Sequence, residues 1–292
     1  MMRVLITGAG SYVGSSFANW LSKWPDKYTV DTIDMRDPAW QETSFAGYDA
    51  VFHVAGIVHR PDAPEDLYYR VNRDLAVAVA GKAKREGVKR LIHMSTASVY
   101  GLEGKAGRHS EIGADTPPNP NTPYGKSKYE ADVLLMDLQG EGFSVCLVRP
   151  PMIFGANCPG NYGRLRRLAL RACCVPALAN TRSMIYIGNF CEYVRLLLHS
   201  GEAGVFCPQD AEPYCTAELM RWIAEENGRK LGQGKLLAVA VRCLAPVLPP
   251  LRKAFGNLTY APALSVVPQG DYCLWSPREA VKATEVGWGE GQ

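Results

Sequence analysis

The sequence predicts an α/β fold, in which a doubly wound parallel sheet is covered by helices and a smaller cap follows towards the C-terminus. Three observations support this. Short β-branched runs alternate with helical patterns through the first half of the chain. A glycine-rich turn joins the first expected strand to the first expected helix, and the alternation loosens after Arg149. Strands that alternate with helices form β-α-β units, so helices should cover both faces of the sheet.

The elements follow from the periodicity of the apolar residues. Apolar residues spaced for a helix alternate with short runs suited to a buried strand. We expect strands at 4–6, 29–33, 50–54, 90–94 and 144–148, and helices at about 13–23, 67–86 and 123–138.

The second half is expected to divide between the two parts of the molecule. Pro150, Pro151 and the glycines of 155–163 indicate that the chain leaves the sheet there. A strand and a helix are expected again within 185–200. The predicted division is a cofactor domain of residues 1–155, to which 184–204 returns, and a substrate-binding cap of residues 156–183 and 205–292.

Composition excludes several classes of protein. The 32 basic and 29 acidic residues give a net charge of only +3 and are spread along the chain, so no nucleic acid partner is expected. The nine cysteines include no C-x-x-C pair, which favours reduced thiols and a cytoplasmic protein, and the five scattered histidines predict no metal site.

No membrane partner is expected from the sequence. The N-terminal apolar run is too short for a secretory signal. The longest apolar stretch, 236–251, is interrupted by Arg242 and three prolines and cannot span a bilayer. We interpret it as an amphipathic segment packed on the protein.

The segment 7–14 predicts a site for a dinucleotide. It lies between the first strand and the first helix, where glycines permit a tight turn and a pyrophosphate can rest on the helix N-terminus. This is the turn of a Rossmann-type cofactor domain. The expected cofactor-binding residues here are Gly8, Gly10, Ser11, Tyr12, Val13 and Gly14.

Asp34 predicts which dinucleotide binds. It ends the second expected strand, twenty residues after Gly14, where a carboxylate can accept hydrogen bonds from the adenosine ribose. Because this charge repels a 2′-phosphate, NAD is favoured over NADP. Arg36, two residues further on, is also assigned to the cofactor site and keeps NADP open.

Tyr124 and Lys128 form the expected catalytic pair. Four residues apart, they share one face of a helix, where an ammonium can lower the tyrosine pKa towards the range of a general base. The hydroxyl-rich segment 94–101 follows a strand whose end should lie at the cofactor crevice. A hydroxyl there can donate to a substrate oxygen.

These motifs together resemble the NAD-dependent epimerase/dehydratase family, the extended short-chain dehydrogenases/reductases. The resemblance covers residues 1 to about 230. It rests on six motifs in the family's order: residues 7–14, Asp34, 53–56, 95–101, the pair Tyr124 and Lys128, and 149–155.

The resemblance implies a role for each matched position. Thr96 would be the catalytic hydroxyl and Tyr124 the acid/base, while Lys128 would bind the nicotinamide ribose and tune Tyr124. Ala55 and Gly56 would line the cofactor. Asn72 would be structural or adjacent to the cofactor, and His53 is expected to be a packed residue.

Two positions depart from the family pattern. Ser11 replaces the middle glycine of the turn, so the turn must accommodate a side chain there. Met152 replaces a frequent asparagine that contacts substrate, and Asn161 is the substitute we expect in the substrate site.

Among family members, the chain is most similar to UDP-glucose/UDP-galactose 4-epimerases. Arg182 stands where those enzymes carry an arginine for the nucleotide-sugar diphosphate, and a guanidinium suits phosphate oxygens. The resemblance implies transient oxidation of the sugar 4-hydroxyl with tightly bound NAD. It also implies a homodimer through helices 67–86 and 123–138.

Two other functions stay open at this stage. A reductase or dehydrogenase of a keto-sugar or another carbonyl would use the same residues. A non-catalytic NAD(P) sensor is less favoured because both Tyr124 and Lys128 are kept. Dehydration is disfavoured, since Ala97 and Ser98 stand where dehydratases carry an acid pair.

Overall fold

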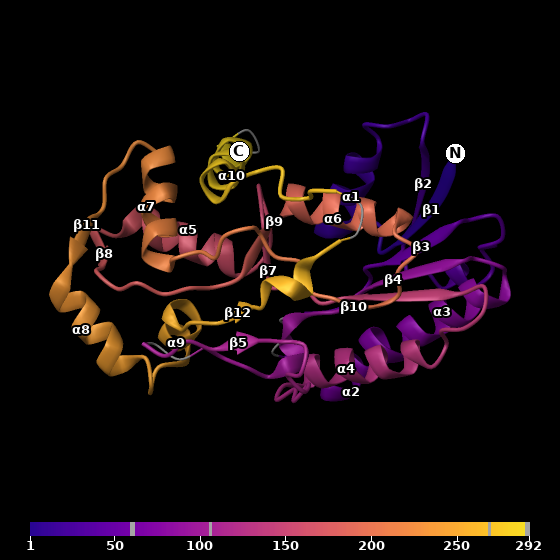
Figure 1. Ribbon diagram of the computed structural model, residues 1–292, viewed down its shortest axis with the longest axis horizontal. Coiled ribbons are helices and arrows are strands. Elements are labelled where there is room, and N and C mark those ends of the chain that lie inside the picture. Colours follow the sequence, from indigo (N-terminus) through magenta and orange to yellow (C-terminus); the bar gives the residue numbers. More distant parts are fainter. Residues whose placement is uncertain (59–61, 105–106, 268–269, 290–292) are drawn as a thin grey trace.

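A six-stranded parallel sheet forms the centre of the computed structural model, which describes residues 1–58, 62–104, 107–267 and 270–289 (Figure 1). The order across the sheet is β10-β6-β4-β3-β1-β2. This confirms the predicted fold class. The strands are β1 (Met2–Thr7), β2 (Tyr28–Ile33), β3 (Ala50–His53), β4 (Arg90–Met94), β6 (Ser144–Val148) and β10 (Gly204–Phe206).

The strand order reverses at β1, which has β2 on one side and β3 on the other. Thr7, the last residue of β1, is in register with Ile33 of β2 and with His53 of β3, so these three strands end level. Ligands of open α/β sheets bind outside the carboxyl ends of the strands at such a reversal. The fold therefore places its ligand crevice beside the turn that follows β1.

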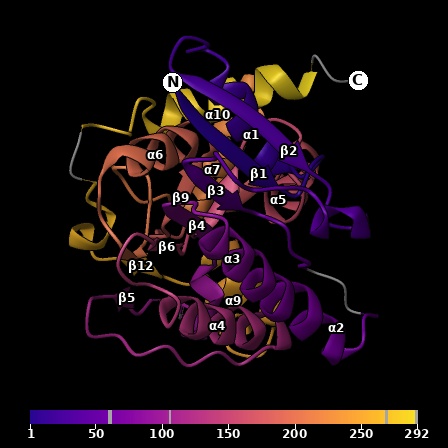
Figure 2. The same cartoon turned by 90° about the vertical axis from the view of Figure 1, so that its right-hand side faces the viewer.

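Helices cover both faces of the sheet, as Figure 2 shows. Helices α1 (Tyr12–Leu21) and α6 (Ile187–His199) pack on one face against Val4, Ile6 and other alternate strand residues. Helices α3 (Leu75–Arg85) and α4 (Pro123–Met136) pack on the other face against Leu5 and its neighbours. Successive strand residues point to opposite faces, so each face has its own core.

The expected helix 67–86 is interrupted in the structure. It consists of α2 (Glu65–Tyr69), a π-helical turn η2 (Arg70–Asp74) and α3. The buried residue of the turn is Asn72, whose side chain bonds both backbone groups of Ile57. Such π turns often occur at functional sites.

Strand β10 also differs from the sequence-based expectation. The segment expected to return to the sheet ended at residue 204, but the chain continues as a strand to Phe206 and pairs with β6 along Gly204–Phe206. A three-residue run carries too little periodicity to predict a strand.

The rest of the chain forms a second body with its own core. That core contains Phe154, Tyr162, Tyr214, Ile223 and Val281. The chain leaves the sheet after β6 and enters β7 only four residues later, so the second body borders the carboxyl ends of the strands. Its elements are β7 (Met152–Phe154), α5 (Asn161–Arg171), β8 (Cys174–Pro176), β9 (Met184–Tyr186), α7 (Thr216–Glu226), β11 (Gly232–Gly234), α8 (Lys235–Leu244), α9 (Pro249–Phe255) and α10 (Pro277–Gly289).

Short strand pairs tie this second body together. β7 pairs with β9, β8 with β11, and β5 (Glu111–Ile112) with β12 (Thr259–Tyr260). All nine cysteines are free thiols. Within the described ranges, no helix is long and apolar enough to cross a membrane, and no three His, Cys, Asp or Glu side chains gather as metal ligands.

The contact between α1 and the sheet yields a stability prediction. Phe17 of α1 packs edge-on against Phe52 of β3, with ring centroids 5.1 Å apart, and both are fully buried. Phe17→Ala should lower the free energy of unfolding by about 3–5 kcal/mol, because it leaves a cavity in a packed core. Denaturant unfolding measures this loss, and Leu236→Ala at an exposed site should stay within about 0.5 kcal/mol of the parent. A loss at Phe17 as small as that of the control would contradict the packing described.

Candidate active site

The backbone of the glycine turn after β1 lies very close to the backbone at the ends of β2 and β3. Gly8 has a φ of +106°, and a Cβ there would lie 3.0 Å from the backbone nitrogen of Ala55. The amides of Gly8 and Ala9 both donate to the carbonyl of Ile33, at 2.8 and 2.9 Å. These contacts join the turn to the ends of β2 and β3 and leave no room for a side chain. Gly10, also at positive φ, has open space around it.

Ser11 fits the turn without strain although the family pattern has glycine there. Its φ is −73°, and its side chain caps α1 by accepting a hydrogen bond from the amide of Gly14 at 3.1 Å. A serine is a favourable residue at this position of a helix. A Cβ on Gly14 would lie 2.7 Å from the Ser11 hydroxyl oxygen, so this cap requires glycine at 14.

The next two residues turn their side chains into the protein. Val13 packs on the sheet core, and Tyr12 packs on the core of the second body, where burial raises the pKa of its phenol. Within the described part of the chain, the backbone amides of Tyr12 and Val13 donate to no other group. A helix N-terminus with free amides suits an anion.

Asp34 and Arg36 lie beside the turn but bind each other. The guanidinium of Arg36 contacts both carboxylate oxygens of Asp34, with a shortest distance of 2.7 Å. Hydrogen bonding to Arg36 lowers the pKa of Asp34 to about 2. The carboxylate is therefore charged at neutral pH, and both residues remain accessible to solvent at the end of β2.

The end of β3 carries Ala55 and Gly56 to the same edge. Ala55 is buried against Gly8, and Gly56 is exposed. A Cβ on Gly56 would lie 3.0 Å from Oδ1 of Asn72 and 3.4 Å from Nζ of Lys128. This segment thus connects the glycine turn to the expected catalytic lysine.

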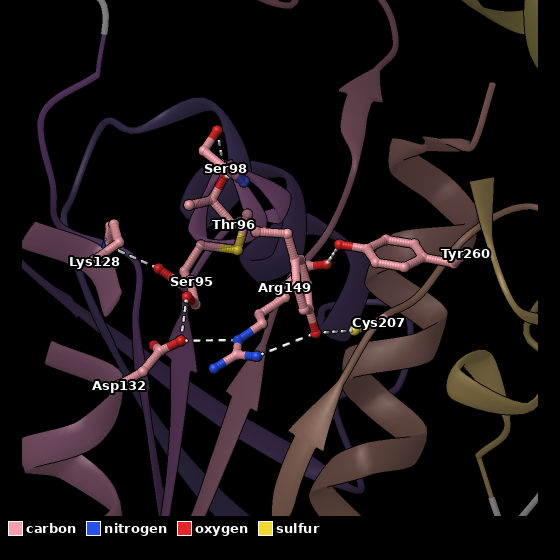
Figure 3. A network of polar contacts seen from close by, with 10 residues as sticks. Ser95, Thr96, Ser98, Lys128, Asp132, Arg149, Cys207 and Tyr260 are labelled. Carbon is pink, nitrogen blue, oxygen red and sulfur yellow. Dashed lines mark hydrogen bonds and ion pairs between the residues drawn. The ribbon is translucent and has the colours of Figure 1, made fainter. Parts of the chain in front are cut away.

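Helix α4 begins at the site because of its first residues. Thr122 caps it by accepting a hydrogen bond from the amide of Gly125 at 3.1 Å, and Pro123 occupies the first turn. Tyr124, in the first turn, is half-buried, and Lys128, one turn later, is buried. The Lys128 ammonium donates to the backbone carbonyl of Met94 at 2.8 Å, at the end of β4 (Figure 3).

Thr96 faces Tyr124 from the segment that follows β4. Its hydroxyl caps the short helix η3 (Ala97–Tyr100), accepting from the amide of Ser98 at 3.1 Å. A hydrogen bond between Thr96 and Tyr124 favours the ionised phenol. The structure therefore brings together all three residues expected to be catalytic.

The tyrosine pKa differs from the sequence-based expectation. Burial raises the pKa of Tyr124, and the hydrogen bond with Thr96 only partly opposes this. Burial also lowers the pKa of Lys128 to about 8. The ammonium is engaged with the Met94 carbonyl, so in this state it does not lower the pKa of the phenol as the four-residue spacing suggested.

A buried polar network under the catalytic pair was not foreseen from the sequence. Asp132 follows Lys128 by one turn and is almost completely buried. It accepts hydrogen bonds from Ser95 Oγ at 2.9 Å and from Arg149 Nε at 2.9 Å. Figure 3 shows these contacts between α4 and the ends of β4 and β6. The four-residue spacing Tyr124, Lys128, Asp132 could have indicated a buried acid on the same helix face.

The network continues into the second body. Arg149 Nη1 donates to the Tyr100 hydroxyl at 3.1 Å, and Tyr100 lies 3.7 Å from the Cys207 sulfur. The Tyr260 hydroxyl, on β12, donates to the carbonyl of Arg149 at 2.8 Å (Figure 3). The position of α4 is thereby coupled to that of the second body.

Arg182 lies in the second body close to this network. Its Nη1 donates to the carbonyl of Gly256 at 3.0 Å, and burial lowers its pKa. The hydroxyl of the next residue, Ser183, accepts from the amide of Tyr260 at 2.8 Å. Arg182 is therefore connected to Arg149 through its neighbour Ser183 and through Tyr260, which bonds both Ser183 and Arg149.

Asn161 and Met152 lie outside the network around the catalytic pair. Asn161 is exposed and opens α5 directly after Gly160. Met152 is half-buried at the start of β7. No contact with Tyr124, Lys128 or Thr96 is described for Asn161, so its place in the substrate site stays a prediction.

Asn72 and His53 support the site from behind. The Asn72 amide donates to Ser127 Oγ at 3.2 Å and to the carbonyl of Ile57, which links η2 to α4 and to the segment after Gly56. His53 bonds Thr7 at 2.6 Å and stacks on His93 at 5.5 Å. Burial lowers the pKa of His53 to about 3, so it is a neutral packing residue.

Fold and site define a Rossmann-type enzyme with a tyrosine–lysine pair, and comparison with known proteins identifies its family. The sequence profile of the NAD dependent epimerase/dehydratase family matches residues 4–205. The chain therefore belongs to the NAD dependent epimerase/dehydratase family.

Two curated relatives illustrate the similarity. The chain is 32% identical to an N-acetyl-α-D-glucosaminyl-diphospho-ditrans,octacis-undecaprenol 4-epimerase of Escherichia coli O157:H7, over 69% of this chain and 64% of that protein. That match spans less than two thirds of the relative's length. A UDP-glucose 4-epimerase of Vibrio cholerae is 26% identical over 76% of this chain and 74% of that protein.

Solved structures share the whole fold. A UDP-glucuronic acid 4-epimerase from Bacillus cereus in complex with NAD superposes with a TM-score of 0.77, at 17% identity and 99% coverage of both chains. RMD from Pseudomonas aeruginosa, complexed with NADPH, also gives 0.77, at 19% identity over 99% of this chain and 100% of that one.

The Asp132–Arg149 ion pair should be a large contributor to stability. Asp132→Ala leaves the Arg149 guanidinium buried without its carboxylate, and we expect a loss of about 3–5 kcal/mol in unfolding free energy. The double variant Asp132→Ala/Arg149→Met should lose less, because neither charge then remains buried alone. Asp137→Ala, exposed at the end of the same helix, should change little. Equal losses in the single and double variants, measured by denaturant unfolding, would refute the pairing.

Lys128 predicts a pH-dependent stability. Its folded pKa of about 8 lies below the ordinary 10.5, so between these values the unfolded chain binds more protons and stability rises with pH. The buried ammonium costs stability below about pH 8. As the pH rises through this range, the unfolding free energy of the parent should increase by about 3 kcal/mol relative to that of Lys128→Met, which lacks the titrating group.

Unfolding of the cofactor-free protein near pH 7 and near pH 10 measures this difference. Lys126→Met, exposed on the same helix, is the matched control and should follow the parent at both values. A constant offset between Lys128→Met and the parent at the two pH values would contradict the depressed pKa of Lys128.

Proposed function

We propose that the chain is a nucleotide-sugar 4-epimerase that acts by transient oxidation of the sugar 4-hydroxyl with tightly bound NAD. The observation that carries this proposal is the meeting of the Tyr124, Thr96 and Lys128 side chains at the carboxyl edge of the sheet, beside the Ala55–Gly56 segment. Membership of the epimerase/dehydratase family and the two curated 4-epimerases support it.

The glycine turn fits a dinucleotide. Gly8, Gly10 and Gly14 keep side chains away from the backbone path, and the unpaired amides of Tyr12 and Val13 at the start of α1 suit a pyrophosphate. Ser11 keeps this helix end in place as its cap. When bound, the cofactor supplies the hydride acceptor and a positive nicotinamide ring.

The opposite end of the cofactor would meet Asp34. Its carboxylate can accept hydrogen bonds from the adenosine ribose hydroxyls, and its charge disfavours the 2′-phosphate of NADP. Arg36, at present on Asp34, is the residue that a 2′-phosphate would attract. Gly56 and Lys128 would lie at the nicotinamide ribose, since they meet at the end of β3.

The chain's own residues can move the proton that oxidation requires. Tyr124 takes this proton from the sugar 4-hydroxyl. It returns the proton after the oxidised sugar has rotated in the site. Thr96, hydrogen-bonded to Tyr124, holds the same sugar oxygen. Burial raises the pKa of the Tyr124 phenol, and the positive charge of a bound cofactor would lower it again. Proton transfer by Tyr124 would therefore depend on bound cofactor.

Arg182 is the residue proposed for the substrate's diphosphate. Arg182 is half-buried, and its guanidinium makes one described side-chain hydrogen bond, to Gly256, so it has further donors for phosphate oxygens. The relative from Vibrio cholerae is named for a UDP-sugar, and the one from Escherichia coli for a sugar on diphospho-undecaprenol. Both carriers present a diphosphate, so a lipid carrier is the second substrate class.

A reductase of a keto-sugar is the alternative that the same residues allow. One solved structure that shares the fold, RMD from Pseudomonas aeruginosa, is complexed with NADPH. The need for added NAD(P)H distinguishes the two functions. An epimerase regenerates its cofactor in each cycle, whereas a reductase consumes it.

The test is proton NMR of UDP-glucose and of UDP-N-acetylglucosamine incubated with the protein without added reductant. The parent should form the 4-epimer. Tyr124→Phe should slow conversion by about 10²–10⁴-fold, because it removes the proton-transfer group. Tyr129→Phe, on the same helix, should convert at the parent's rate.

Cofactor content decides what a negative result means. NAD released from denatured Tyr124→Phe in the parent's amount shows that the loss concerns chemistry and not folding. Equal rates for Tyr124→Phe and the parent would overturn the role of Tyr124. Conversion only with added NAD(P)H would replace the epimerase by the reductase.

A further inference from the structure

Helix α8 turns an apolar face away from the protein. The residues that pack inward, against Leu178 and Phe255, are Ala238 and Val241. Leu236 is 87% exposed and Val239 57% exposed on the opposite side of this helix, and Val247 in the following turn is 70% exposed. Figure 1 places α8 at the end of the molecule farthest from β1 and β2. Large aliphatic side chains this exposed and this close together mark an interaction surface.

The surface extends through the turn to Leu248, the residue before α9. Leu237, Leu244 and Leu248 are also exposed. Together with Leu236, Val239 and Val247 they define what we call the α8–α9 surface. The sequence predicts that 236–251 packs on the protein, and the structure shows this for Ala238, Val241, Ala245 and Leu251 but not for the larger side chains between them.

The charged residues of the segment that carries this surface have one sign. Residues 227–270 contain no Asp or Glu and six basic residues, namely Arg229, Lys230, Lys235, Arg242, Arg252 and Lys253. Lys235 and Arg242 are exposed and lie seven residues apart on one flank of α8, and the described residues offer neither an ion pair. Arg252 and Lys253 instead pair with Glu103.

We propose that the α8–α9 surface docks on an anionic lipid bilayer. Apolar side chains at the headgroup level and unpaired cations beside them are the two features that hold an interfacial helix on a membrane. The helix lies on the bilayer and does not cross it. The apolar side chains supply burial, and Lys235 and Arg242 meet lipid phosphates.

A second copy of the chain fits this surface less well. A twofold contact would bring the same patch, with its cations and no acids, against itself, and like charges repel. One helix of ten residues and its turn also offers less than the roughly 800 Å² per partner of a standard interface.

Helix α9 connects the surface to the proposed substrate site. α9 ends at Phe255, and the carbonyl of the next residue, Gly256, accepts the hydrogen bond from Arg182. A sugar whose diphosphate rests on Arg182 would therefore lie one short helix away from the segment that meets the membrane. This part rests on the proposed function and favours its lipid-carrier class, whereas the docking surface stands without it.

Vesicle co-sedimentation of the full chain tests the docking surface. We use phosphatidylcholine vesicles with and without phosphatidylglycerol, and no substrate. The parent should bind the anionic vesicles, and added salt should weaken binding. Leu236→Glu/Val247→Glu should bind at least about tenfold more weakly, because two apolar side chains no longer enter the bilayer. Lys235→Gln/Arg242→Gln should lose about tenfold or more on anionic vesicles.

Matched controls keep the result specific. Val286→Glu places the same charge at an exposed valine of α10 and should bind as the parent does. Both glutamate variants should keep the parent's unfolding transition and its turnover of the water-soluble UDP-sugar. Tyr124→Phe should lose turnover and keep vesicle binding, which separates failure of the docking surface from failure of the proposed function.

Three outcomes would overturn the docking surface. The first is a parent that stays in the supernatant with every vesicle composition. The second is equal binding by the parent and Leu236→Glu/Val247→Glu. The third is a dimer in sedimentation velocity that this variant dissociates, without vesicle binding, which would assign the surface to a second copy.

Discussion

The burial of charge on one face of α4 is the constraint on which the site depends. Lys128 and Asp132 leave water together, and each needs a partner because an isolated buried charge costs several kcal/mol. Lys128 uses the carbonyl that ends β4, and Asp132 uses Arg149, which follows β6. These two bonds fix the helix that carries Tyr124 against the carboxyl edge of the sheet. Tyr260 then joins the second body to Arg149.

The cofactor side of the fold could be predicted from the sequence because its determinants are local. Strands 90–94 and 144–148 were predicted with the boundaries that the structure shows, and the glycine turn lies where its spacing placed it. What escaped prediction depends on distant partners. The π turn around Asn72 exists with bonds to Ile57 and Ser127, and β10 becomes a strand only beside β6. Asp132 shows its role only once Arg149 is next to it.

The protonation states of Tyr124 and Lys128 could not be predicted from their four-residue spacing alone. Tyr124 and Lys128 do share a helix face, but the spacing does not reveal that the ammonium finds the Met94 carbonyl first. Burial then moves both pKa values towards the neutral forms, upward for the phenol and downward for the ammonium. A site in this condition needs charge supplied by a bound ligand before the phenol becomes an effective base. Ser11 is the converse case, since a departure from the motif proves to be a good helix cap.

The outward face of α8 also escaped prediction from the sequence. In residues 235–244 the charged side chains Lys235 and Arg242 share one flank, so periodicity favours packing of the opposite side, which the structure leaves in water. The structure selects Ala238 and Val241, and leaves the larger side chains in water. Neither a buried ammonium at Lys128 nor an exposed Leu236 stabilises the isolated chain. Features that lower stability persist where function uses them.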